Sequence, residues 1–244
     1  MAKVLAVIPA RLESVRLPRK PLREICGRPM IVWVYERARR AACLDRVLVA
    51  TDSQELADFC EGQNIPVMMT SSAHRSGTDR VWEVLGREPA DLCVNIQGDE
   101  PMISPDHLEL LVRPFQAGPP TQVSTLKVAI GLEAARSPHN VKVVTDLRGQ
   151  ALYFSRALIP HDRDAPGRAQ YYKHLGLYAY TREALEKFHH LPPSRLEQLE
   201  QLEQLRFLEN GIPITVMETS QDTIGVDTEE DLREVEAYFR QHQS

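Results

Sequence analysis

The chain contains 244 residues, of which 43% are hydrophobic and 26% are charged, and its formal net charge at pH 7 is −5. This composition is ordinary for a soluble globular protein, and the acidic balance argues against a general nucleic-acid binder. The four cysteines are scattered without a C-x-x-C pair, so we expect reduced, packed thiols and no zinc site. No stretch is long or apolar enough for a signal peptide or a membrane span, and we therefore expect a cytoplasmic protein with no membrane partner.

The first half of the chain alternates short apolar runs with helical patterns. We expect strands at 3–8, 47–51, 67–69 and 92–96, and helices that begin at Pro29 and near residues 54 and 79. The strands are almost continuous apolar runs, which is typical of a sheet covered by helices on both faces. This alternation predicts an α/β fold with a mostly parallel central sheet.

The second half has a different pattern. We expect strands at 123–130, 141–145, 151–154, 173–180 and 214–218, with a hairpin turn at 146–149. A helix is predicted over 196–208, ended by Asn210-Gly211, and a last helix runs from the capping-box-like Thr228 to about residue 241. Neither 119–120 nor 164–167 resembles an interdomain linker. We therefore expect one domain over 1–244, with an inserted mixed or antiparallel patch at about 120–220.

The loop after the first strand is unusually basic. It carries Arg11, Arg16, Arg19 and Lys20 against the single acid Glu13, although the whole chain is acidic. Ligands of open parallel sheets bind outside the carboxyl ends of the strands, where this loop would lie. The loop contains neither a P-loop nor a G-x-G-x-x-G pattern, so its side-chain cations would have to replace backbone amides. It predicts a site for a polyanion such as a nucleoside triphosphate, and a merely solvated loop is the alternative.

Two acids follow strand ends and are candidates for a magnesium site. Asp99 lies in the segment 97–101 directly after the fourth strand of the first half, and Asp227 precedes the last helix. Magnesium in phosphate sites is held by one or two carboxylates together with substrate phosphates and water. An ordinary turn at Asp99 and a helix N-cap at Asp227 are the alternatives.

Other polar residues permit two interpretations each. Ser76 or Thr78 could contact a base or ribose, and either could equally be a helix N-cap. His174 could be a satisfied core histidine, or it could belong to a sugar-acid pocket with Arg156 and Tyr178. Most acids of the Leu-Glu-Gln pattern within 196–208 are expected to face solvent.

Segments spaced over nearly the whole chain resemble the bacterial 3-deoxy-manno-octulosonate (Kdo) cytidylyltransferases. The matching segments are 8–11, 14, 16–18, 20–22, 76–80, 95–101, 141–144, 151–156, 174–176, 202–206 and 225–228. The related sialic-acid cytidylyltransferases share the opening Pro-Ala-Arg, but their loop usually continues in a Gly-Ser-Lys style. The sequence of residues 14–18 here, Ser-Val-Arg-Leu-Pro, resembles that of the Kdo cytidylyltransferases.

The resemblance implies transfer of CMP from CTP to Kdo with release of pyrophosphate, for lipopolysaccharide synthesis. It also implies a Rossmann-like core, dependence on Mg²⁺ and a homodimer. The residues that it places at the nucleotide are Pro9, Ala10, Arg11, Arg16, Lys20, Arg75, Ser76, Gly77, Gln97 and Asp99. It assigns the metal to Asp99 and Asp227, and these two acids together with Lys20 and Arg16 form the expected catalytic group. The residues that it places at the sugar are Arg156, His174, Tyr178, Glu203 and Gln204. We expect Arg19 to be a solvated bystander.

Two alternatives remain open at this point. The acceptor could be a related acidic sugar, an 8-amino-Kdo or a sialic acid, because one changed substituent is not visible in the sequence. The chain could also be a non-catalytic nucleotide-binding protein, although that hypothesis predicts loss of the metal acids, and both Asp99 and Asp227 are present. The choice of CTP and the dimer follow only from the resemblance, and no residue is identified as a general base.

Overall fold

The computed structural model describes residues 2–14, 16–74, 76–116, 120–163 and 168–242. The chain forms two compact units: Met1–Glu109 together with Thr223–Ser244 make the first, and Leu110–Asp222 make the second. The first unit is therefore built from both ends of the sequence. That the two units act as a single domain, with 120–220 as its insert, stays a prediction. None of the described helices is both long enough and apolar enough to cross a membrane.

The first unit contains a parallel sheet with the strand order β6-β1-β4-β5. Its strands are β1 (Val4–Pro9), β4 (Arg46–Thr51), β5 (Val67–Met69) and β6 (Leu92–Asn95). The central strand β1 pairs with β4 through Ala6↔Val47 and with β6 through Ala6↔Val94. Its residues from Leu5 to Ile8 have no exposed surface, as predicted for a strand covered on both faces. The α/β class with parallel strands is confirmed.

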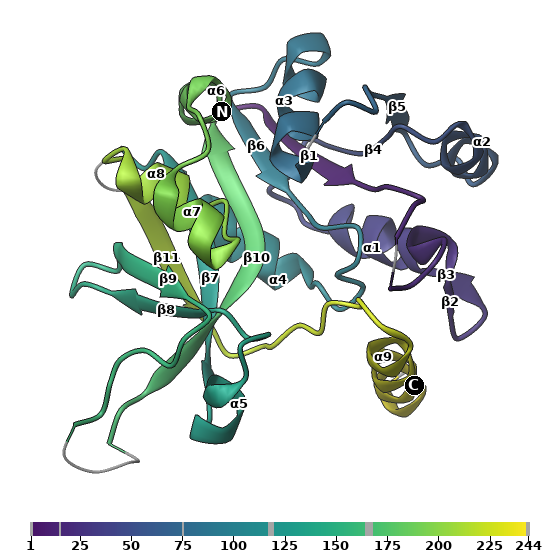
Figure 1. The fold of residues 1–244 in the computed structure, drawn as a ribbon. Coiled ribbons are helices and arrows are strands. Elements are labelled where there is room, and N and C mark those ends of the chain that lie inside the picture. Colours follow the sequence, from purple (N-terminus) through teal and green to yellow (C-terminus); the bar gives the residue numbers. More distant parts are fainter. Residues whose placement is uncertain (1, 15, 75, 117–119, 164–167, 243–244) are drawn as a thin grey trace. The chain divides into compact units, whose positions relative to one another are not determined.

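Helices and one small hairpin complete the first unit (Figure 1). They are the hairpin β2 (Glu24–Ile25) and β3 (Arg28–Pro29), the 3₁₀ turn Lys20–Leu22, and the helices α1 (Met30–Ala38), α2 (Gln54–Gly62), α3 (Gly77–Arg87) and α9 (Glu229–His242). Helix α4 (Pro105–Val112) spans the sequence boundary between the units. Ser53 caps α2 and Ser76 caps α3, each accepting a hydrogen bond from a backbone N–H of the first turn. Pro29 ends β3 and precedes α1, so this helix begins one residue later than predicted.

The second unit contains the predicted mixed patch. Its strands are β7 (Val123–Ile130), β8 (Lys142–Thr145), β9 (Ala151–Ser155), β10 (Tyr171–Thr181) and β11 (Ile214–Thr219). Strand β7 pairs in parallel with β11, whereas the pairs β7–β10, β8–β10 and β8–β9 are antiparallel. The other elements are the 3₁₀ turn Arg113–Phe115 and the helices α5 (Leu132–Arg136), α6 (Arg182–His190), α7 (Arg195–Glu200) and α8 (Leu205–Glu209).

The helix predicted over 196–208 is wrong as a single element. It is divided into α7 and α8 because Gln201 adopts a left-handed conformation with φ of 54°. Glu197 in α7 also departs from the expected solvent-facing pattern. Its carboxylate is buried and accepts hydrogen bonds from Arg206, whose guanidinium lies 4.1 Å from the centre of the Phe188 ring.

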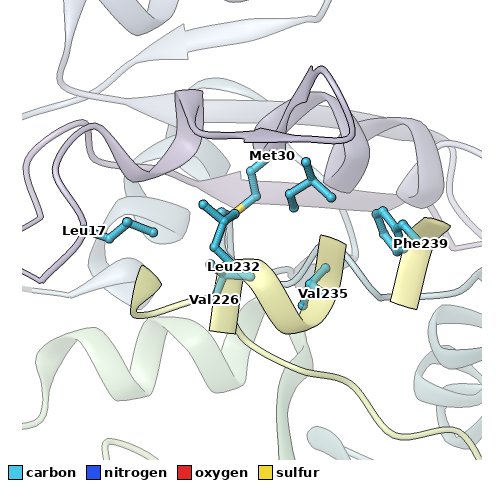
Figure 2. Close-up of a cluster of buried hydrophobic side chains, with 7 residues drawn as sticks. Leu17, Met30, Val226, Leu232, Val235 and Phe239 are labelled. Carbon is cyan, nitrogen blue, oxygen red and sulfur yellow. The ribbon is translucent and has the colours of Figure 1, made fainter. Parts of the chain in front are cut away.

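An apolar cluster joins the C-terminal helix to the basic loop within the first unit (Figure 2). Its buried members are Leu17, Ile25, Met30, Val226, Leu232, Val235 and Phe239. The Phe239 ring packs on Trp33 with 4.8 Å between ring centres. Beside the cluster, Val226 N–H donates a 2.8 Å hydrogen bond to the Asp99 carbonyl oxygen. Apolar burial and this hydrogen bond therefore hold the segment before α9 against the loops that follow β1 and β6.

The substitution Phe239→Ala tests the contribution of this cluster. Removing a fully packed ring leaves a cavity, and we expect the free energy of unfolding to fall by about 3 kcal/mol in urea titrations. Gln241→Ala is the matched control, because Gln241 is exposed on the same helix, and its effect should stay within about 0.5 kcal/mol. Equal losses in the two variants would contradict the role given to the cluster.

Candidate active site

A cavity of about 360 Å³ lies in the first unit where β1 and β6 end. Its lining residues are Pro9, Ala10, Arg11, Glu13, Ser14, Arg16, Lys20, Pro21, Gly77, Arg80, Gln97, Gly98, Asp99 and Asp227. The strand next to β1 on one side is β4 and on the other side is β6, so the chain changes direction across the sheet at β1. Ligand sites of open parallel sheets occur at such a point, outside the carboxyl ends of the strands.

Two glycines allow the loops around the cavity to approach each other closely. A Cβ atom on Gly98 would lie 3.0 Å from the Pro9 carbonyl oxygen and 3.3 Å from Ala10 Cβ. A Cβ atom on Gly77 would lie 3.2 Å from Pro9 Cγ. The absence of a side chain at these two positions therefore lets the loop after β6 and the start of α3 approach the Pro9-Ala10 turn this closely.

Lys20 connects the two predicted metal acids. Its ammonium nitrogen lies 2.6 Å from Asp99 Oδ2 and 2.9 Å from Asp227 Oδ1. Burial alone would lower the pKa of Lys20, but the charges and hydrogen bonds of Asp99 and Asp227 outweigh it and raise the pKa above its usual 10.5. Lys20 is therefore a permanent cation at the wall of the cavity.

Asp227 is fixed on several sides. Arg16 pairs with its Oδ2 atom at 2.9 Å. Burial alone would raise the pKa of Asp227, but the hydrogen bonds and charges of Lys20 and Arg16 hold that pKa below its usual 3.8. The backbone N–H of Asp227 donates to Asp231 Oδ2 at 2.9 Å, and Thr228 Oγ1 donates to the same oxygen. Thr228 is therefore the N-cap of α9, since its Oγ1 also accepts from Asp231 N–H at 3.2 Å, and the Asp227 carboxylate takes no part in the cap.

Two side chains of the basic loop face away from the cavity: one is apolar and buried, and the other is basic and pairs with a neighbouring helix. Leu17 is fully buried in the cluster with α9, and Pro21 is buried as well. Arg19 forms an ion pair with Glu55 on α2 and is not among the residues that line the cavity. This placement agrees with the expectation that Arg19 is a bystander.

Arg80 lines the cavity but was not among the predicted site residues. It is only 1% exposed, and its guanidinium donates to Asp52 Oδ2 at 2.9 Å and to Thr70 Oγ1. The sequence does contain a signal for it: Arg80 lies four residues before Val84, on the apolar face of α3. A basic residue on such a face must be paired when it is buried.

The two acids suit a magnesium ion. Their carboxylates approach the same Lys20 nitrogen, so both oxygen donors already converge on a cation. Among the described residues there is no group of three or more His, Cys, Asp or Glu side chains that could hold a metal by itself. That limited donor set fits Mg²⁺, which takes few protein ligands and completes its coordination with phosphate and water.

The structure brings most of the predicted nucleotide residues together. Those at the cavity are Pro9, Ala10, Arg11, Arg16, Lys20, Gly77, Gln97 and Asp99, and the predicted metal acid Asp227 lines it as well. Ser76 does not line the cavity, and its hydroxyl caps α3 by accepting from Asp79 N–H at 3.1 Å. Arg75 lies outside the described residues.

The predicted sugar residues all lie in the second unit. His174 and Tyr178 on β10 pack together with 5.4 Å between ring centres, and the charge of Glu203 acts on Tyr178. Burial is the largest cause that raises the pKa of Tyr178 well above its usual value, so its hydroxyl stays protonated. Arg156 is bound differently, because its Nε atom donates to the Glu200 carbonyl oxygen at 2.9 Å.

His174 is a neutral residue with a defined hydrogen bond. Burial lowers its pKa to about 3, and the charge of Lys173 acts in the same direction. Its Nε2 atom lies 3.0 Å from Thr125 Oγ1, which also lies 2.7 Å from the Leu177 carbonyl oxygen. When the single hydroxyl hydrogen of Thr125 goes to this carbonyl, His174 Nε2–H donates to Thr125 and Nδ1 is left as an acceptor.

Two buried polar atoms of this set have no hydrogen-bond partner among the residues that the structure describes. They are Tyr178 Oη and Gln204 Nε2. Buried polar atoms normally have a partner, so such atoms point to a ligand or to ordered water. The same region contains Glu200, which the sequence analysis did not select. Its carboxylate accepts hydrogen bonds from Ser155 Oγ and Arg156 N–H.

The sequence and the fold are similar to those of known cytidylyltransferases. A family model described as "Cytidylyltransferase" matches residues 5–219, so the chain is a member of this class of proteins. The 3-deoxy-manno-octulosonate cytidylyltransferase of Acidobacterium capsulatum is 56% identical over 96% of this chain and 95% of its own length. The protein of the same name from Koribacter versatilis is 54% identical over 98% of this chain and 90% of its own.

Solved structures agree. The structure of a CMP:2-keto-3-deoxy-manno-octonic acid synthetase complexed with CTP matches with a TM-score of 0.95 at 45% identity, over 98% of this chain and 99% of that one. A cytidylyltransferase from Leptospira borgpetersenii has the same fold, with a TM-score of 0.65 at 16% identity, over 100% of this chain and 89% of that one. The chain belongs to the 3-deoxy-manno-octulosonate cytidylyltransferase family, as its sequence motifs predicted.

The substitution Gly98→Ala tests the close approach of the two loops. The new methyl group would press on the Pro9 carbonyl oxygen and displace the turn that lines the cavity, so we expect the dissociation constant of CTP, measured by calorimetry, to rise about tenfold. Gly86→Ala is the matched control, because nothing lies within 4 Å of a Cβ atom built there. Unchanged CTP affinity in the Gly98 variant would show that the close approach is unimportant.

Proposed function

We infer that this chain is an enzyme that transfers CMP from CTP to the anomeric hydroxyl of Kdo and releases pyrophosphate. The observation that carries the inference is the cavity at the end of β1, where the three cations of the basic loop, Arg11, Arg16 and Lys20, meet two converging carboxylates. A triphosphate with its metal requires this combination of charges. Membership of the 3-deoxy-manno-octulosonate cytidylyltransferase family supports the choice of CTP and Kdo.

In this proposal the basic loop holds the triphosphate. Arg11, Arg16 and Lys20 bind the phosphate oxygens, and the Pro9-Ala10 turn contributes its backbone. Gln97 and the segment around Gly77 hold the cytidine, together with the adjacent Arg75 and Ser76. Lys20 and Arg16 are the residues that we propose for stabilising charge on the phosphates during the reaction.

Asp99 and Asp227 are the residues that would hold Mg²⁺. When bound, this ion would offset phosphate charge and help to align the triphosphate. Their second role concerns Lys20: the two carboxylates keep its ammonium group protonated and fix its position. Replacing either acid therefore disturbs both the metal site and the lysine.

The sugar is proposed to bind to the second unit. Tyr178 Oη and Gln204 Nε2 are buried donors that hydroxyl groups of a sugar acid would satisfy. Glu203 would accept hydrogen bonds from sugar hydroxyls, and neutral His174 offers its Nδ1 atom as an acceptor. Arg156 is the cation proposed for the sugar carboxylate, with Glu200 orienting its backbone and side chain.

The reaction forms one bond and breaks one. The anomeric oxygen of Kdo attacks the α-phosphorus in line, the bond from that phosphorus to the bridging oxygen breaks, and the electron pair leaves with pyrophosphate. The hydroxyl proton is released, and no side chain is assigned as its acceptor. Little covalent chemistry is required of the protein, so the positions and charges of Lys20, Arg11 and Arg16 provide the catalysis.

We further propose that the protein acts as a homodimer in the cytoplasm and supplies CMP-Kdo for lipopolysaccharide synthesis. These three statements are supported by the family resemblance. The competing proposal for the sugar substrate is a related acidic sugar, either an 8-amino-Kdo or a sialic acid.

The test of the function is a pyrophosphate-release assay with each of the four nucleoside triphosphates and each candidate sugar. We expect turnover with CTP and Kdo and little with the other combinations. A preference for the 8-amino sugar or for a sialic acid would overturn the assignment of the acceptor. Tight CTP binding without turnover on any sugar would instead support a non-catalytic nucleotide-binding protein.

The substitution Asp99→Asn tests the metal assignment. We expect turnover to fall at least about a hundredfold while CTP binding stays within about tenfold, because charge stabilisation is lost mainly in the transition state. Asp91→Asn is the matched control: the Asp91 carboxylate accepts the Lys3 backbone N–H in the first unit, but Asp91 does not line the cavity. The turnover of this variant should be unchanged. Chelation with EDTA should abolish wild-type turnover, and added Mg²⁺ should restore it. Full activity of Asp99→Asn would refute the role of Asp99.

A further inference from the structure

One face of α3 presents three charged side chains to the segment 69–74, which begins at the last residue of β5. Arg80, Glu83 and Arg87 are spaced at i, i+3 and i+7, which places them along the same side of a helix. Arg80 donates to Thr70 Oγ1, and Arg87 donates to the Met69 carbonyl oxygen at 2.8 Å. The start of this segment is therefore bound at two points by the helix that comes after it in the chain.

Glu83 binds the rest of the segment. Its Oε2 atom accepts a 2.8 Å hydrogen bond from Ser71 N–H and lies 2.5 Å from His74 Nε2. Its Oε1 atom accepts from Arg87, one turn further along α3. A carboxylate only accepts hydrogen bonds, so the Nε2 atom of His74 carries the hydrogen. The side chain of Glu83 is 19% exposed, and its three partners leave it a single position.

The segment held by Glu83 contacts a residue of the cavity. The guanidinium of Arg11 donates to the carbonyl oxygen of His74. Arg11 is otherwise an exposed, long side chain, and its rotamer freedom would have to be lost when it binds a phosphate. The hydrogen bond to the His74 carbonyl oxygen already restricts the Arg11 side chain, so less conformational entropy is lost when the phosphate binds. This holds only if His74 is itself fixed.

We propose that Glu83 is a positioning residue for nucleotide binding: it fixes His74, and the His74 carbonyl oxygen holds the Arg11 guanidinium at the cavity. This inference rests on the function proposed above, because it assigns Glu83 a part in binding the CTP phosphates. Glu83 does not line the cavity itself. Its effect must therefore be transmitted through His74 and Arg11.

The experiment compares Glu83→Gln with the wild type by CTP calorimetry and by steady-state kinetics. A glutamine has a single acceptor oxygen for these three donors: with that oxygen toward Ser71 and His74, its amide nitrogen faces the Arg87 guanidinium, which is also a donor. The side chain is therefore displaced, and its hydrogen bond to His74 loses the charge of the carboxylate. We expect the dissociation constant and KM for CTP to rise about tenfold, while kcat and KM for Kdo stay within about twofold. Glu88→Gln is the matched control, because Glu88 caps the same helix and pairs with Arg46 at 2.7 Å, away from this segment.

A double-mutant cycle separates positioning from general stability. In an Arg11→Ala background, adding Glu83→Gln should change CTP affinity by less than about twofold, because the residue through which Glu83 acts is already gone. A full tenfold effect in that background would overturn the proposal. So would a drop in thermal stability of Glu83→Gln with no change in CTP affinity.

Variants of His74 provide a second route if Glu83→Gln folds poorly. His74→Ala should weaken CTP binding about as much as Glu83→Gln does. His74→Gln should restore the affinity to within about twofold, because the glutamine amide can donate to Glu83 from a similar position. Equal affinities of the wild type and His74→Ala would contradict the proposal. A wild-type protein that binds no CTP would refute the proposed function, whereas tight wild-type binding with no effect of these variants would refute only the role of Glu83.

Discussion

The ammonium group of Lys20 is the interaction on which the rest of the site depends. The carboxylates of Asp99 and Asp227 lie 2.6 Å and 2.9 Å from the same Lys20 nitrogen. The two negative charges repel each other, and the cation between them makes the arrangement favourable. Arg16 adds the second positive charge, so that two cations face two anions. The charges of the group are therefore balanced before any ligand binds, and the two carboxylates are already held together in the folded chain.

Two different kinds of force hold the walls of the cavity. The basic loop and the segment before α9 are fixed mainly by apolar burial, because Leu17 and Val226 share one cluster. The segment 69–74 is fixed by charged hydrogen bonds from α3 instead. Apolar burial has no preferred direction, whereas hydrogen bonds set the orientation of individual groups. Apolar burial therefore keeps the loops close together, whereas the hydrogen bonds from α3 orient individual groups such as the His74 carbonyl.

The sequence was sufficient for the strands of the main sheet, for the helices α1, α2, α3 and α9 and for the residues of the basic loop, because apolar period and loop charge are local properties. It did not indicate the hairpin β2–β3 or the helices α4, α5 and α6. It could not reveal the division of 196–208 into two helices, since the left-handed conformation of Gln201 comes from tertiary context and not from its helix propensity. Arg80 and Glu83 escaped selection for another reason. Their partners are Asp52, Thr70 and His74, and only the folded chain brings these groups to α3.

The return of the C-terminal segment to the first unit has a consequence for the newly made chain. Lys20 and Asp227 are separated by 207 residues, and a ribosome that adds about 5–20 residues per second needs about 10–40 s to make that length. During this interval the first unit lacks α9, four of the seven buried members of the apolar cluster and one of the two carboxylates. The pair of carboxylates at Lys20 is therefore completed only after all of the second unit has been synthesised.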